Sequence, residues 1–216
     1  MIINHNTEAY RARWRKNERN KFNGAFYYSQ EICDIMIPLV KTDRNWVTVN
    51  VYGYAADHSI VFIHNNLHPE YYKHLERRND LILVCGIPET MEKVAHLGTP
   101  IYLPLSVDVG YVEQFRLDSH PKEAAFVGRS IKRKGKEFPE PVDFIEGLSR
   151  SVLLSKMAKY KRVYGVGRVA LEAKILGCEV CPYDPRFPDP DRWHVLDTRD
   201  AAVILQRKLD EIDGVK

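Results

Sequence analysis

The sequence predicts an α/β protein made of two Rossmann-like lobes with parallel sheets, in which the N-terminal lobe is reduced. Short apolar segments rich in Val, Ile, Phe and Tyr alternate with longer amphipathic segments, the order expected of βαβ units. Several short segments are almost continuously apolar, which suits strands buried on both faces of a parallel sheet. The length of 216 residues fits one domain of moderate size or two lobes of about 100 residues each.

The expected strands fall into two groups along the chain. A polar stretch at residues 106–122 lacks clear periodicity and separates the groups. We therefore expect an N-terminal lobe of residues 1–118 and a C-terminal lobe of residues 119–216. The expected strands are residues 46–52, 59–64, 81–85, 101–105, 124–127, 142–146, 162–164 and 179–183.

The amphipathic segments between these strands predict helices. Gly177 is typical of the C′ position after a helix, and Ser149 and Ser151 are candidate N-caps. The expected helices are residues 25–40, 68–79, 88–98, 149–160, 167–177 and 199–212.

The composition excludes several protein classes. With 44% hydrophobic residues, 28% charged residues and a net charge of +3, the chain is unlike disordered, collagen-like or coiled-coil proteins. It has no apolar run of roughly 18 residues and no apolar region near its N-terminus, so we expect neither a membrane span nor a secretory signal. Four cysteines are too few for a disulfide scaffold, which favours a cytoplasmic location.

Basic residues gather in two segments, residues 11–21 and 129–136. Such segments indicate local anion binding or a solvated charged surface. Tyr10 and Trp14 accompany the first segment, and basic residues beside aromatic ones can bind nucleic acid by phosphate contact and stacking. An amphipathic helix that packs Trp14 against the body is the alternative.

The most informative stretch, residues 162–184, has the order strand, glycine turn, helix, glycine, strand. Gly165 and Gly167 permit a tight turn at a helix N-terminus, where unpaired N–H groups and the helix dipole favour a phosphate. Arg168 adds a positive charge at the same place. The stretch therefore predicts a phosphate-binding turn.

Two ligands fit such a turn. Gly165, Gly167 and Ala170 match the dinucleotide fingerprint G-x-G-x-x-A, in which Asp184 would hold a ribose. That fingerprint usually opens its domain, whereas here it lies near the C-terminus. An NAD-type site is thus one interpretation, and a nucleotide-sugar site, described next, is the other.

Residues 164–180 resemble the C-terminal domain of GT-B glycosyltransferases, which commonly shows E-G-F-G-x-x-x-x-E-A-x-A-x-G-x-P-V. The two glycines, the Glu172–Ala173 pair and Gly177 fall in register. The resemblance implies that Glu172 accepts hydrogen bonds from the ribose hydroxyls of the donor nucleotide. The sequence departs from the family at Tyr164, where retaining members have a glutamate beside the donor sugar, so that role is not transferred.

Two more segments resemble the same family. Residues 101–108, IYLPLSVD, resemble the strand and turn that lead into the donor domain, and residues 124–129, AAFVGR, resemble its first strand and glycine turn. In that family an arginine and a lysine nearby bind the diphosphate. The candidate donor-binding residues in this part are Gly128, Arg129, Lys132 and Lys134. The N-terminal half lacks the glycine-rich first loop of a typical acceptor domain.

The resemblance implies a metal-independent glycosyltransferase that moves a sugar from a nucleotide-diphosphate sugar to an acceptor hydroxyl. It needs no resident cofactor, because the nucleotide sugar is a substrate. His64, at the end of an apolar segment, is the candidate general base, and the alternatives are Asp57, His58 and His68. A non-catalytic nucleotide- or nucleic-acid-binding protein with this fold is the second hypothesis.

Two short motifs suggest metals, but we expect none to bind. Cys178 and Cys181 are expected to be buried thiols, because residues three apart on a strand face opposite ways. Asp189-Pro-Asp191 is expected to form a turn. The sequence leaves the acceptor open among a glycan, a small molecule and modified DNA, and it leaves open self-association into a homo-oligomer.

Overall fold

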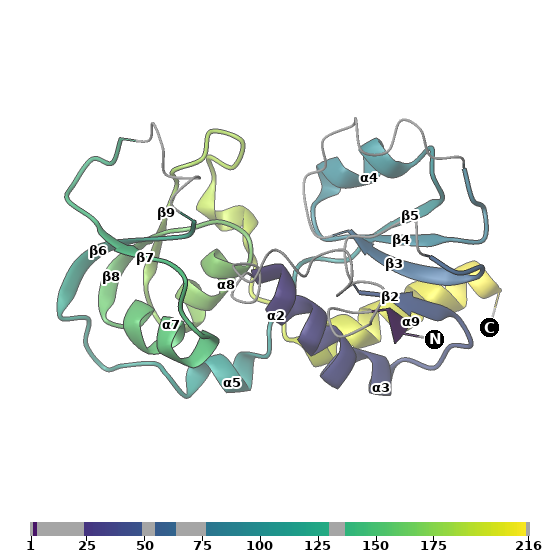
Figure 1. The fold of residues 1–216 in the computed structure, drawn as a ribbon, viewed down its shortest axis with the longest axis horizontal. Coiled ribbons are helices and arrows are strands. Elements are labelled where there is room, and N and C mark those ends of the chain that lie inside the picture. Colours follow the sequence, from purple (N-terminus) through teal and green to yellow (C-terminus); the bar gives the residue numbers. More distant parts are fainter. Residues whose placement is uncertain (1, 4–23, 49–54, 64–76, 130–136, 215–216) are drawn as a thin grey trace. The chain divides into compact units, whose positions relative to one another are not determined.

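The computed structural model describes residues 2–3, 24–48, 55–63, 77–129 and 137–214. It confirms the predicted class, because the fold is α/β with two parallel sheets and helices packed on them (Figure 1). No helix among these residues combines the length and the hydropathy that crossing a membrane requires.

The described residues form two compact units. Unit 1 contains residues 2–3, 25–105 and 198–214, and unit 2 contains residues 106–197 together with Gly24. The expected division lay at residue 118 and kept the C-terminus with the second lobe. In the structure the change of unit follows Leu105, and the C-terminal helix belongs to unit 1.

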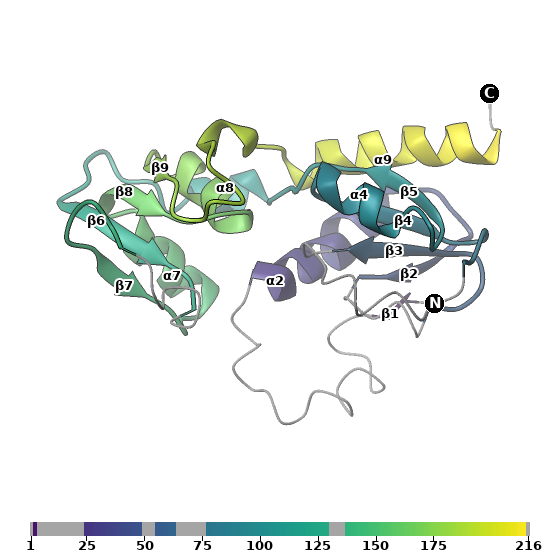
Figure 2. The same cartoon turned by 90° about the horizontal axis from the view of Figure 1, so that it is seen from above.

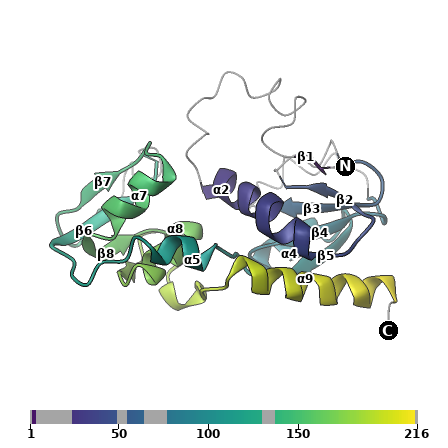
Figure 3. The same ribbon diagram turned by 90° about the horizontal axis from the view of Figure 1, so that it is seen from below.

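Packing of the C-terminal helix explains its place in unit 1. Helix α9 (Thr198–Asp213), the yellow helix of Figure 3, buries Leu205 and Leu209 on one face. It contacts η2 (Ile32–Met36) and α3 (Ile37–Leu39). Near its end, Arg44 Nη2 lies 2.5 Å from Asp213 Oδ1. The helix therefore completes a unit whose other elements precede it by more than ninety residues.

Unit 1 has a five-stranded parallel sheet in the order β1-β2-β3-β4-β5 (Figure 2). Strands β3 and β4 are buried along their whole length, as their apolar sequences predict. On one face, Val61 and Leu83 pack with Val94 of α4 (Pro88–Val94), and on the other Tyr28 of α2 (Gly24–Glu31) meets Phe62. The strands are β1 (Ile2–Ile3), β2 (Asn45–Val47), β3 (Ser59–Ile63), β4 (Ile82–Cys85) and β5 (Thr99–Tyr102).

The helix expected at residues 25–40 is not α-helical throughout. Its middle, η2, is π-helical, with the Ile37 N–H donating to the Ile32 carbonyl five residues back. Pro38 follows directly and has no N–H to continue the α-helical pattern. The proline thus accounts for a break that hydrophobic periodicity does not reveal.

Unit 2 has a four-stranded parallel sheet in the order β7-β6-β8-β9. One face carries an aromatic cluster in which Phe126 and Tyr164 pack with Phe138. Two helices pack on the sheet. Helix α7 (Arg150–Met157) contacts β7 and β8, and helix α8 (Arg168–Ile175) contacts β8 and β9. The remaining elements are β6 (Lys122–Val127), β7 (Asp143–Ile145), β8 (Tyr160–Tyr164), β9 (Glu179–Cys181), α5 (Val109–Glu113) and η5 (Pro190–Arg192).

The order of the unit 2 strands creates a topological switch point between β6 and β8. The chain leaves β6 towards β7 on one side, and it returns past β6 to β8 on the other. In open α/β sheets, ligands bind at the carboxyl ends of the strands next to such a point, because the connections diverge there. The residues that directly follow β6 and β8 are therefore the candidates for ligand binding.

Candidate functional site

The glycine turn after β8 has the conformation that the sequence predicts. Gly167 is the N-cap of α8 and has φ +62° and ψ −131°, a backbone conformation that side chains disfavour. A Cβ on Gly165 would lie 2.4 Å from Val169 Cγ1, in the first turn of α8. Both glycines are thus needed to bring the backbone from β8 into the helix within three residues.

The side chains behind this turn form a buried ionic cluster. Arg168 Nε donates to Glu172 Oε1 at 2.8 Å, one helical turn further along α8. Arg150 Nη2 lies 3.3 Å from the same oxygen. The side chains of Arg168, Glu172 and Arg150 are only 7%, 4% and 12% exposed. Two guanidinium groups therefore converge on one carboxylate oxygen in a largely water-excluded place.

Both helices of this cluster begin with an arginine. Arg150 is the first residue of α7 and Arg168 the first of α8, and neither helix has an acidic residue in its first turn. A cation at a helix N-terminus is disfavoured by about 0.3–1 kcal/mol, since it faces the positive end of the dipole. Two helix ends and two arginines therefore concentrate positive potential that favours an anion.

Arg150 is held on a second side by an aromatic ring. Its Cζ lies 5.0 Å from the centre of the Tyr111 ring in α5. Sequence reasoning did not single out Arg150 or Tyr111. The only signal for Arg150 is that it follows Ser149, a predicted N-cap that the structure places at the N-cap position.

The end of β6 provides the other side of the switch point. The Gly128 N–H donates to the Ile145 carbonyl at 3.1 Å, which ties the end of β6 to β7. A Cβ on Gly128 would lie 3.1 Å from the Phe126 ring. Arg129 is exposed, and the predicted donor-binding residues Lys132 and Lys134 lie outside the described residues.

Tyr164, at which the sequence departs from the glycosyltransferase pattern, has a carboxylate neighbour. Its hydroxyl donates to Glu140 Oε1 at 2.9 Å, and Arg162 forms an ion pair with the same carboxylate. Arg162 lowers the pKa of Glu140, while burial and the bond to Glu140 raise the pKa of Tyr164. These contacts anchor the segment before β7 onto the sheet, together with Phe138.

The residues of the dinucleotide interpretation make different contacts. Asp184 is buried, and its carboxylate is bound through both oxygens by Arg186, with Nη2–Oδ2 at 2.6 Å and Nε–Oδ1 at 3.0 Å. In this structure the carboxylate that would hold a ribose is therefore engaged by an arginine two residues along the chain.

The two motifs that suggest metals take part in packing and in a turn. Cys178 and Cys181 are buried thiols, as expected, and burial raises the pKa of Cys178 to about 11. Asp189 accepts a hydrogen bond from the Asp191 N–H at 2.8 Å and caps η5, which is the expected turn. Within the described part of the chain, no group of three or more His, Cys, Asp or Glu could hold a metal ion.

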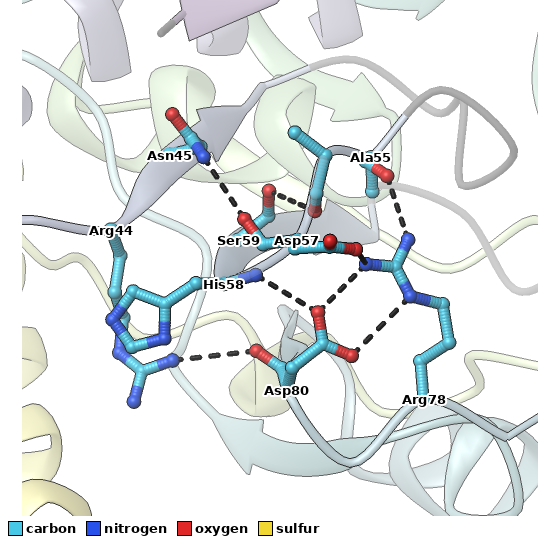
Figure 4. Close-up of polar contacts among 9 residues, drawn as sticks. Arg44, Asn45, Ala55, Asp57, His58, Ser59, Arg78 and Asp80 are labelled. Atoms are coloured by element: carbon cyan, nitrogen blue, oxygen red, sulfur yellow. Dashed lines mark hydrogen bonds and ion pairs between the residues drawn. The ribbon is translucent and has the colours of Figure 1, made fainter.

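Two of the candidate general bases, Asp57 and His58, lie directly before β3, at its amino end. In Figure 4 the backbone N–H of His58 donates to Asp80 Oδ2 at 2.9 Å. The Nε2 of the His58 ring lies 3.1 Å from Asp43 Oδ1. Arg78 binds Asp80 and Asp57, and it lowers the pKa of Asp80. The amino edge is opposite to the edge where open α/β sheets bind ligands. His64 and His68 lie outside the described residues.

The structure thus brings Gly165, Gly167, Arg168 and Glu172 together at the start of α8. The preceding strand, β8, pairs with β6, which leads to Gly128 and Arg129. Neither a scan against protein-family models nor a search of curated proteins finds a match for this chain. The chemistry of this edge of the unit 2 sheet is therefore what points to a function.

Proposed function

We propose that the chain binds a nucleotide-diphosphate sugar at the carboxyl edge of the unit 2 sheet and transfers the sugar to an acceptor hydroxyl. One observation carries the proposal: two buried arginines, each at the start of a helix, converge beside the glycine turn at the switch point. Such a place favours a phosphate-bearing ligand.

Within this proposal the donor-binding residues have separate roles. Gly165 and Gly167 let the ligand approach the start of α8, whose N–H groups and dipole favour a phosphate oxygen. Arg168 supplies a planar fork of donors suited to phosphate. Arg129, Lys132 and Lys134, which follow Gly128 in the sequence, supply further positive charge.

The chemistry follows from this placement. When the bond between the sugar and the diphosphate breaks, its electron pair remains with the departing nucleoside diphosphate. The growing negative charge is stabilised by the helix N-terminus and the basic side chains, so the reaction requires no metal ion. The acceptor hydroxyl loses its proton as it attacks, and His64 is our candidate to accept it.

The cellular location and the acceptor are also part of the proposal. All four cysteines are free thiols, which supports the reducing cytoplasm as the location. The acceptor is a glycan, a small molecule or modified DNA. The basic residues of segment 11–21 support the last of these, because phosphate contacts would attract the DNA backbone.

A thermal-shift screen against UDP-, GDP- and ADP-sugars tests donor binding, and calorimetry then measures the affinity. We expect Arg168→Gln and Arg129→Ala each to weaken donor binding by about 1.5–3 kcal/mol, because charge-assisted hydrogen bonds are lost. Lys122→Gln is the matched control, since it removes one charge at the opposite edge of the same sheet. Unchanged affinity in both arginine variants would reject the site.

Release of nucleoside diphosphate on addition of acceptor then separates transfer from binding. A protein that binds the donor but releases no diphosphate with any acceptor supports the non-catalytic hypothesis. Stabilisation by NAD(H), abolished by Asp184→Asn, supports the dinucleotide interpretation instead.

A further inference from the structure

Glu172 has a different environment from the one that a ribose-binding carboxylate needs. Its Oε1 accepts from Arg168 at 2.8 Å and lies 3.3 Å from Arg150 Nη2, and its side chain is 4% exposed. A ribose offers two neutral hydroxyls. Turning the carboxylate towards them would exchange its ion pairs with two guanidinium groups for hydrogen bonds from uncharged donors, and the attraction between opposite charges in a buried place would be lost. Glu172 is thus better placed to hold the arginines than to hold a sugar.

The arginines, in contrast, would lose nothing by exchanging one anion for another. A phosphate group carries several acceptor oxygens and matches the guanidinium fork at least as well as a carboxylate does. The longer contact, from Arg150, is the one more easily exchanged. The Tyr111 ring, 5.0 Å from Arg150 Cζ, keeps that guanidinium in place while its partner changes.

We propose that Glu172 is an internal counter-ion, which holds Arg150 and Arg168 in the empty protein and gives them up to a ligand diphosphate, and that Arg150 is a further phosphate-binding residue. The proposal rests on the proposed function, because it concerns the same site, and it names what that site recognises. The diphosphate group is the recognised part of the ligand, and the ribose hydroxyls contribute little. Glu172 is accordingly a positioning residue.

This proposal makes a prediction opposite to that of the family resemblance. If Glu172 competes with the ligand for the arginines, then removing its charge makes an inorganic diphosphate bind more tightly. If Glu172 accepts from ribose hydroxyls, the same change weakens nucleotides and leaves inorganic diphosphate unaffected. Inorganic pyrophosphate, which has no ribose, therefore distinguishes the two roles.

The experiment is titration calorimetry of the full chain with inorganic pyrophosphate, UDP and 2′,3′-dideoxy-UDP. We expect Glu172→Gln to bind pyrophosphate about tenfold more tightly, and Arg150→Gln about tenfold more weakly, than the unmodified protein. UDP and its dideoxy analogue should have equal affinities. Glu123→Gln is the matched control, since it removes an exposed carboxylate at the start of β6 and should change nothing.

Each other outcome has a definite meaning. Pyrophosphate affinity that is unchanged or lower in Glu172→Gln overturns the counter-ion role, and the absence of pyrophosphate binding to any variant does the same. Pyrophosphate binding that responds as expected, in a protein that binds no nucleotide sugar, rejects the proposed function but supports this inference. If Glu172→Gln does not fold, Arg150→Gln decides, because full pyrophosphate affinity in that variant overturns the proposal.

Discussion

Each unit holds a cluster of arginines and carboxylates at one edge of its sheet, and the two clusters differ in burial and in composition. At the amino edge of unit 1, Arg78 meets two carboxylates, Asp57 and Asp80, and all three side chains are at least 28% exposed. At the carboxyl edge of unit 2, two arginines, Arg150 and Arg168, meet one carboxylate, and no side chain is more than 12% exposed.

The two clusters differ in their expected affinity for an additional anion. In unit 1 a single guanidinium joins the segments that precede β3 and β4, with a further bond of 2.7 Å to the Ala55 carbonyl. Its anions outnumber its cation, so the cluster has no reason to attract another anion. In unit 2 two buried arginines, each at a helix N-terminus, face a single carboxylate. A phosphate bound there would stabilise this excess of positive charge.

The largest expected effect tests the difference in burial. Glu172→Ala should lower the free energy of unfolding by about 3–5 kcal/mol, since removing one partner of a buried ion pair leaves buried charge behind. Asp80→Ala should lower it by about 1 kcal/mol or less, because exposed ion pairs contribute little. Urea unfolding of both variants measures the two values, and similar losses would contradict the contrast.

Backbone changes at the glycine turn come next in size. Gly165→Ala should cost about 1–3 kcal/mol, because its Cβ would overlap the branched Val169 side chain. Gly167→Ala should cost about 1–3 kcal/mol through its positive φ. Gly110→Ala in α5 is the control: outside the helix's own backbone, the nearest atom to the added Cβ is Asp108 Oδ1 at 3.9 Å, so we expect no loss. Thermal unfolding distinguishes the three, and a loss at Gly110 equal to the others would remove the argument from the turn.

Local sequence patterns predict most of the strands and the glycine turn of the candidate site. Buried strands appear as apolar runs, and Gly165, Gly167 and Gly177 mark a turn and a helix end by their conformational freedom. Gly177 does follow α8, with φ +83°. Thus the strand–turn–helix part of the candidate site is predictable from the sequence alone.

Contacts between distant parts of the chain were not predictable in the same way. The return of α9 to unit 1 depends on packing against η2, far away in the sequence. Arg150 reaches Glu172 only because α7 and α8 start at the same edge of one sheet. A single sequence carries no periodic signal for such pairs, so the contacts Arg150–Glu172 and Glu140–Tyr164 are visible only in the structure.

The smallest expected effect concerns pH and the unit 1 cluster. The hydrogen bond from Arg78, with a further one from the His58 N–H, lowers the pKa of Asp80 below its ordinary value. A carboxyl whose pKa is lower in the folded protein contributes stability that is complete above its unfolded pKa of about 3.9 and is lost as the pH falls through the folded value. We therefore expect Asp80→Asn to be less stable than the unmodified protein at pH 6, by about 1 kcal/mol or less, and the two to converge below about pH 4. Urea midpoints across that range measure the convergence, and a double variant with Arg78→Gln shows whether Arg78 causes it. A difference that stays constant down to pH 3 would mean that Asp80 acts through packing, not through its charge.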